Sequence, residues 1–172
     1  MSATPLAGVR MLVMDVDGVL TDGLLYYSAE GEALKAFHVR DGAAITFLHK
    51  AGLTSAVITG RSAQATVKRL TELGVHHVFT GTADKLAALR ELAHDTGIPP
   101  AETAYIGDDL HDLAPMRACA ISFAPADAAP EVRAACTHPL AASGGRGAVR
   151  EAVEMILKAH GTWDTVLATY CS

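Results

Sequence analysis

The chain has 172 residues, a net charge of −5, and 50% hydrophobic against 19% charged residues. This size and composition suit one domain with a sizeable core and exclude a disordered chain. The acidic balance disfavours nucleic acid and anionic membrane as partners. No apolar run reaches the roughly 18 residues of a membrane span, and the first nine residues lack the pattern of a secretory signal, so we expect a cytoplasmic location.

Short apolar runs alternate with helix-like patterns along the chain. The predicted order is strand 11–14, β-hairpin 24–38, helix 41–51 with Asp41 as N-cap, strand 53–58, helix 62–73, strand 75–79, helix 83–96, strand 103–106, helix 110–117, strand 119–123, helix 127–135, glycine-rich loop 141–147 and helix 148–160. The alternation predicts an α/β fold with a Rossmann-like, mostly parallel sheet flanked by helices. We expect one domain over 1–172, and residues 161–172 have no clear assignment.

The stretch D-V-D-G-V-L-T, from Asp15 to Thr21, directly follows the predicted strand 11–14. Side chains two positions apart on an extended chain point the same way, so Asp15 and Asp17 should face one pocket. Two such carboxylates suit a nucleophile and a general acid that act on one substrate beside a divalent cation. The alternative is a strand end followed by an Asx turn, and this motif alone leaves both open.

Polar residues also follow three later strands. Thr59 and Gly60 follow strand 53–58, Lys85 lies at the start of helix 83–96, and Asp108, Asp109 and Asp112 follow strand 103–106. In parallel sheets the ligand site lies outside the carboxyl ends of the strands, so these groups should meet. Each has a structural alternative (a turn, a surface lysine, a helix cap), but only a shared site accounts for all of them.

The chemistry that these groups support is phosphoryl transfer. A hydroxyl and backbone N–H groups at a helix start, with a lysine, suit a phosphate. Asp15 and Asp108 with a backbone carbonyl could hold Mg²⁺, which prefers a few carboxylates, water and substrate phosphate. Asp15 would then attack phosphorus, and Asp17 would protonate the leaving alcohol.

These residues resemble the haloacid dehalogenase-like (HAD) phosphatase superfamily. Its motifs are matched by D-V-D-G-V-L-T, I-T-G-R, D-K and G-D-D-L-H-D. The resemblance implies a Mg²⁺-dependent phosphatase with an aspartyl-phosphate intermediate. The implied roles are Asp15 as nucleophile and metal ligand, Asp17 as acid/base and, through its carbonyl, metal ligand, Thr59, Gly60 and Lys85 as phosphate-binding groups, Asp108 as metal ligand, and Asp109 and Asp112 as supporting acids.

The gaps between the motifs narrow the subgroup. The 42 positions from Asp17 to Thr59 and the 26 from Thr59 to Lys85 cannot hold a full cap domain. The segments D-G-L-L-Y-Y, G-E-A-L-K-A-F-H-V-R-D-G and G-G-R-G-A-V-R-E look like the 3-deoxy-D-manno-octulosonate 8-phosphate (Kdo8P) phosphatase family, in lipopolysaccharide biosynthesis. That resemblance implies a capless homotetramer, in which hairpins pack together and subunits help to cover each other's sites.

Four arginines are candidates for binding the substrate: three for its carboxylate, and one in a loop that could cover the site. Guanidinium suits a planar bidentate partner, which favours Arg40, Arg61 and Arg69 (or Lys68) for the sugar acid. The loop 144–147 could fold over the site as a lid and bring Arg146 to the substrate, or it could be a plain turn. Two other functions remain open: the same chemistry on a nine-carbon keto-sugar acid 9-phosphate, which Arg61 disfavours because such relatives tend to carry Glu there, and a catalytically silent HAD scaffold.

Overall fold

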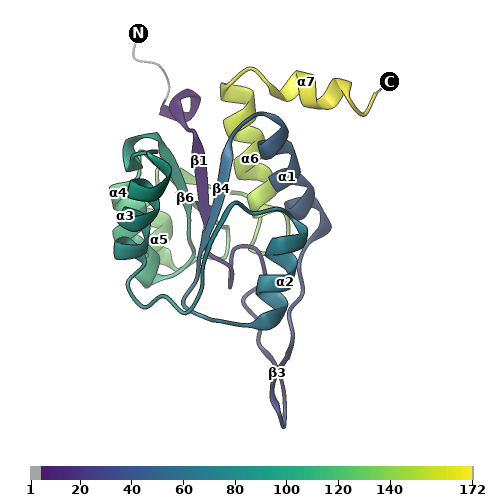
Figure 1. The fold of residues 1–172 in the computed structure, drawn as a ribbon, viewed down its shortest axis with the longest axis vertical. Helices are drawn as coiled ribbons and strands as arrows, with labels where there is room; N and C mark the ends of the chain where they lie inside the picture. Colours follow the sequence, from purple (N-terminus) through teal and green to yellow (C-terminus); the bar gives the residue numbers. More distant parts are fainter. Residues whose placement is uncertain (1–4, 172) are drawn as a thin grey trace.

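A computed structural model describes residues 5–171 as a parallel sheet with helices on both faces (Figure 1). The strand order is β5-β4-β1-β6-β7-β8, and every pairing is parallel. The α/β prediction is confirmed, and the sheet is wholly parallel. The strands are β1 (Met11–Met14), β4 (Thr54–Ile58), β5 (His77–Phe79), β6 (Thr103–Ile106), β7 (Ile121–Ala124) and β8 (His138–Pro139), of which β8 was not predicted.

The helices form two layers. On one face lie α1 (Val39–Lys50), α2 (Gln64–Glu72) and α6 (Ala148–Ala159), and on the other α3 (Lys85–Thr96), α4 (Leu113–Ala118) and α5 (Pro130–Ala135) (Figure 1). Alternate residues of β1 serve the two layers: Leu12 and Met14 pack towards α1 and α6, and Met11 and Val13 towards α3. A strand buried on both faces reads as a continuous apolar run, which is why the sequence revealed β1.

The β-hairpin of β2 (Tyr26–Ser28) and β3 (Gly31–Leu34) projects from the carboxyl edge of the sheet (Figure 1). Its strands are shorter than the predicted 24–38 region, and the second begins at Gly31, not at residue 33. The φ of +120° at Gly31 explains the error, because this glycine ends the tight turn after Ala29 and Glu30 instead of lying within it. The hairpin leaves several large apolar side chains exposed: Leu24, Leu25, Tyr26, Tyr27 and Leu34.

Asp41 does not cap α1, the helix for which it was the predicted N-cap. Helix α1 starts at Val39 after His38, and Asp41 lies buried in its first turn. Its carboxylate instead accepts hydrogen bonds from the backbone N–H groups of Gly147 (3.1 Å) and Arg150 (2.8 Å) at the start of α6. Asp41 therefore caps a helix more than one hundred positions away, which local sequence could not reveal.

The C-terminal segment forms a short helix, α7 (Trp163–Ala168), at the amino edge of the sheet, opposite the hairpin (Figure 1). Trp163 and Tyr170 pack edge-on against Phe47, and the Arg150 guanidinium lies over the rings of both Phe47 and Trp163. Among residues 5–171, no helix has the length and hydropathy to cross a membrane.

Candidate active site

Most of the predicted motif residues meet in one pocket of about 460 Å³ at the carboxyl edge of the sheet. The pocket lies where the order of the strands reverses, since β4 and β6 pair with opposite sides of β1. The sequence predicts a site at this edge, and the pocket lies there; its role as the active site stays a prediction. The lining residues are Asp15, Asp17, Gly23, Thr59, Gly60, Arg61, Thr82, Ala83, Lys85, Asp108, Asp109 and His111.

A buried charge cluster forms the floor of the pocket. Lys85 Nζ lies 2.7 Å from Asp15 Oδ2 and 2.8 Å from Asp112 Oδ1, and all three side chains are at most 4% exposed. Burial opposes the charge of Lys85, but the two carboxylates outweigh it and raise the pKa of the lysine. We call Asp15, Lys85, Asp112 and Tyr105 the buried cluster.

Asp112 uses both of its oxygens within the protein. Oδ1 accepts from Lys85 and from the Tyr105 hydroxyl (2.9 Å), while Oδ2 accepts from the backbone N–H groups of Asp108 (3.1 Å) and Asp109 (3.3 Å). Asp112 thus fixes the loop after β6 and holds Lys85. The prediction that Asp112 supports the site, rather than reacting, fits this geometry, and Tyr105 is a partner that its place inside a strand concealed.

Asp15 stays ionised in spite of its burial. Burial raises its pKa, but the interaction with His111 and the charge of Lys85 outweigh that effect and hold the pKa below its usual value. His111 Nε2 lies 3.8 Å from Asp15 Oδ2 and lines the pocket. His111 was not predicted as a site residue, although it stands inside the G-D-D-L-H-D motif.

Asp108 carries the observation that fits a cation. Its Oδ1 is buried and has no hydrogen-bond partner among the described residues. Burial, and then the charges of Asp15 and Asp112, raise the pKa of Asp108 to about 7. A divalent cation would relieve this crowding of carboxylates, so the donor set fits Mg²⁺.

The geometry alone allows two sets of side-chain ligands for that cation. Single donor atoms of Asp15, His111 and Asp112 lie within 4.8 Å of one another. However, the oxygens of Asp112 are already occupied by four donors, whereas Asp108 Oδ1 is free. We therefore favour Asp15 and Asp108 as the side-chain ligands.

Gly18 is required for this arrangement. Its φ is +85°, and a Cβ at this position would collide with the Asp108 carboxylate. Gly18 of the first motif thus leaves room for the Asp108 carboxylate of the last motif, and any side chain at position 18 would displace that carboxylate.

Thr59 and Gly60 lie in the loop after β4. Thr59 is buried, and its Oγ1 accepts from the backbone N–H of Arg61 at 3.4 Å. Helix α2 begins at Gln64 instead of the predicted residue 62, so Gly60 lies before the helix start. A phosphate here would meet loop N–H groups and the Thr59 hydroxyl, with little help from a helix dipole.

The sequence comparisons place these features in a known family. The family model for haloacid dehalogenase-like hydrolases matches residues 74–152. A curated Kdo8P phosphatase from Haemophilus influenzae is 46% identical over 156 residues, which cover 91% of this chain and 87% of that protein. The chain belongs to the Kdo8P phosphatase family.

Solved structures of the Kdo8P phosphatase family share the whole fold. The cobalt-bound enzyme of Haemophilus influenzae has a TM-score of 0.92 at 44% identity, covering 94% of this chain and 95% of the other. The Moraxella catarrhalis enzyme, in complex with magnesium ion, phosphate ion and Kdo, has a TM-score of 0.94 at 40% identity, covering 96% and 95%.

The four predicted arginines occupy different places in this Kdo8P phosphatase fold. Arg61 lines the pocket. Within residues 5–171 the pocket lining does not include Arg40 at the exposed start of α1, Arg69, which packs against Gly42 of α1, or Arg146, which lies 3.9 Å from Asp22 and is 70% exposed. A substrate-binding role for these three stays a prediction.

The loop predicted as a lid lies against the loop that follows β1. Gly145 N donates to Val19 O at 2.9 Å, and Cβ atoms at Gly144 or Gly145 would collide with the backbone of residues 18–22. In this structure its glycines therefore support the D-x-D loop from behind. Closure over the pocket stays a prediction.

Proposed function

We propose that this chain hydrolyses Kdo8P to Kdo and phosphate in lipopolysaccharide biosynthesis, with Mg²⁺ as cofactor. The observation that carries the proposal is the pocket itself, where Asp15, Lys85 and Asp108 meet. The relatives add the substrate: the Haemophilus influenzae protein is named a Kdo8P phosphatase, and the Moraxella catarrhalis structure holds magnesium, phosphate and Kdo.

In the first step, Asp15 attacks phosphorus and the bond between phosphorus and the sugar oxygen breaks, which leaves an aspartyl-phosphate. Its lowered pKa keeps Asp15 ionised for this attack. Lys85, Thr59 and the N–H groups near Gly60 bind the phosphoryl oxygens, where negative charge gathers in the transition state.

Asp17 handles the proton. It gives a proton to the leaving sugar oxygen in the first step, and in the second it takes one from the water that attacks the aspartyl-phosphate. Its position in the same pocket as Asp15 supports both roles.

Asp15, the Asp17 carbonyl and Asp108 would hold Mg²⁺, and Asp109 would support them from the rim of the pocket. When bound, Mg²⁺ reduces the repulsion between the carboxylates and the phosphate and stabilises transition-state charge.

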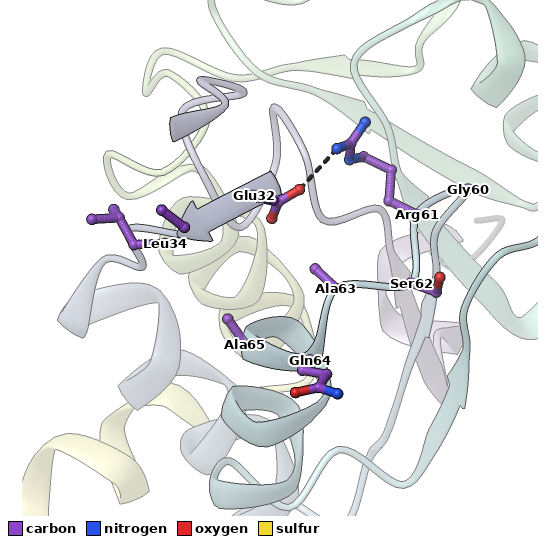
Figure 2. A pocket seen from close by; sticks show the side chains of 9 residues that line it. Glu32, Leu34, Gly60, Arg61, Ser62, Ala63, Gln64 and Ala65 are labelled. Carbon is purple, nitrogen blue, oxygen red and sulfur yellow. Dashed lines mark hydrogen bonds and ion pairs between the residues drawn. The ribbon is translucent and has the colours of Figure 1, made fainter. Parts of the chain in front are cut away.

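The sugar has a cavity beside the phosphate site. It has a volume of about 630 Å³ and shares Gly60 and Arg61 with the catalytic pocket. Figure 2 shows its polar groups, Ser62, Gln64 and the pair of Glu32 with Arg61, between the hairpin and the loop after β4. Hydroxyl groups of a sugar acid suit such a lining, and Arg61 is the candidate for its carboxylate.

The hairpin is proposed as the oligomer contact of a cytoplasmic, single-domain homotetramer. Tyr27 is 63% exposed, Leu24 58% and Leu34 52%, and β2 and β3 pair only with each other among the described strands. Exposed apolar surface and free strand edges favour association with another copy. Light scattering on the wild type and on a Leu24→Ser, Leu34→Ser variant tests this, and an unchanged mass for the variant contradicts it.

The decisive test of function is phosphate release with Mg²⁺ from Kdo8P, a nine-carbon keto-sugar acid 9-phosphate, a hexose 6-phosphate and p-nitrophenyl phosphate. A strong preference for Kdo8P that EDTA abolishes is the expected result. Equal turnover of the nine-carbon ester would overturn the substrate but keep the chemistry. No release from any ester would favour the silent scaffold.

A further inference from the structure

The hairpin contributes a buried lysine to the acid/base aspartate. Lys35 directly follows β3, and its side chain is only 1% exposed. Its ammonium forms an ion pair with Asp17 Oδ1 and lies 3.3 Å from Glu32 Oε1. A buried charge is stable only when it is paired, and these two carboxylates supply the pairing.

Arg61 makes the matching pair of contacts from the other side. Its Nη2 lies 2.8 Å from Glu32 Oε2, and its Nε lies 3.8 Å from Asp17 Oδ2. Nη2 also donates to the Tyr27 hydroxyl at 3.1 Å. Each carboxylate thus turns one oxygen to the lysine and the other to the arginine, which closes a ring of four alternating charges: Asp17, Lys35, Glu32 and Arg61. We call this the hairpin ring.

The hairpin ring stands between the two cavities. Asp17 lines the catalytic pocket, Glu32 lines the sugar cavity, and Arg61 lines both. Figure 2 shows Glu32 and Arg61 in contact with each other at the sugar cavity. The bond that breaks joins the phosphate to the sugar, so the leaving oxygen must lie near this boundary, where the orientation of Asp17 decides whether it can deliver a proton.

We propose that Lys35 is a positioning residue for Asp17, and that Glu32 holds Lys35 and Arg61 in place for it. The proposal rests on the proposed phosphatase function. Through the hairpin ring, a hairpin residue outside the HAD motifs controls proton transfer to the leaving group, while phosphoryl binding by the buried cluster is left intact.

Leaving-group dependence separates this role from a structural one. Lys35→Met should lower kcat/KM for Kdo8P roughly tenfold to a hundredfold, since a misplaced acid loses most of its catalytic contribution. The same variant should change kcat/KM for p-nitrophenyl phosphate less than about threefold, because nitrophenolate leaves without a proton. The ratio kcat/KM is compared because it excludes the later hydrolysis of the aspartyl-phosphate, in which Asp17 acts as a base on either ester. Glu32→Gln should show the same bias to a smaller degree.

The matched control is Glu30→Gln, which removes a carboxylate from the same hairpin but outside the ring, where Glu30 accepts from Ser28. It should retain wild-type kcat on both esters. Lys35→Ala should also recover Kdo8P turnover with added ethylammonium but not with sodium chloride at equal ionic strength.

Several results would overturn the inference. Equal losses of kcat/KM in Lys35→Met on both esters mean a structural role, and no loss on either means no role. If circular dichroism shows that Lys35→Met does not fold, Glu32→Gln decides by the same comparison. A wild type that hydrolyses no alkyl phosphate refutes the proposed function itself, which is distinguishable from a wild type that is active while its variants lose both activities equally.

Discussion

The buried cluster and the hairpin ring each contain one of the two aspartates that are proposed to react, and they differ in burial. In the buried cluster, Lys85, Asp15 and Asp112 are 1%, 4% and 0% exposed. The hairpin ring is fully buried only at Lys35, which is 1% exposed, whereas Glu32, Asp17 and Arg61 are 15%, 21% and 41% exposed. Charges interact more strongly where water is excluded. We therefore expect the buried cluster to affect both stability and chemistry, and the hairpin ring to affect mainly chemistry.

The largest effect is expected from Asp15, the proposed nucleophile. Asp15→Asn keeps the shape of the side chain but removes the attacking oxygen anion, so kcat should fall by at least about a thousandfold. Phosphate release and the mass of the trapped phosphoenzyme measure this. Asp95→Asn, on the exposed end of α3, is the control and should retain activity. Full turnover by Asp15→Asn would refute the nucleophile assignment.

Asp112→Asn tests the stability of the buried cluster. Because it leaves the buried Lys85 with one carboxylate and replaces an acceptor by a donor, the free energy of unfolding should fall by about 3–5 kcal/mol. Urea denaturation of the metal-free protein provides the value. A loss below about 1 kcal/mol, equal to that of Asp95→Asn, would mean that the cluster resembles a surface pair.

Asp108 makes the stability of the metal-free protein depend on pH. Its pKa is about 7 when folded and near 3.8 when unfolded, so between these values the folded state binds a proton that the unfolded chain releases. This contribution to stability is therefore present below pH 4 and is lost as the pH rises through 7.

The difference in unfolding free energy between wild type and Asp108→Asn, followed from pH 4 to 8, isolates this effect. Relative to Asp108→Asn, wild type should lose stability as the pH rises. Mg²⁺ binds the ionised carboxylate, so it should raise the wild-type Tm more at pH 8 than at pH 5. A difference that does not vary with pH would contradict the raised pKa.

The smallest effect on the free energy of unfolding is expected for Glu32→Gln in the hairpin ring. Glu32→Gln removes a charge that pairs with the partly exposed Arg61 and with the buried Lys35. Exposed pairs contribute about 0–1 kcal/mol, and Lys35 keeps Asp17 as its partner, which limits the loss on that side. Thermal unfolding should therefore shift by only a few degrees, although Kdo8P turnover falls as described above. A stability loss as large as that of Asp112→Asn would remove the distinction between the two clusters.

The sequence was sufficient to predict which residues lie just after each strand, at the carboxyl edge of the sheet. Asp15 and Thr59 directly follow β1 and β4, and Asp108 follows β6 after Gly107. Neighbouring parallel strands bring such positions together whatever the rest of the chain does. The alternating apolar runs and helical patterns gave the α/β fold for the same reason, since burial on two faces leaves a pattern in the sequence. The bounds of the hairpin and the N-cap of α1 were wrong, because a tight turn and a distant partner decided them.

Only the tertiary structure decided which charges meet across elements. Lys35, Glu32 and Arg61 come from a hairpin and a distant loop, and Asp41 reaches α6 from α1. These contacts depend on how the hairpin folds back over the strand ends and on how the helices pack against each other. No periodicity or spacing in the sequence predicts either arrangement. The sequence by itself determined which polar groups gather at the carboxyl edge, because strand ends are local. The tertiary structure decided their charged partners, because an ion pair requires proximity in space and not along the chain.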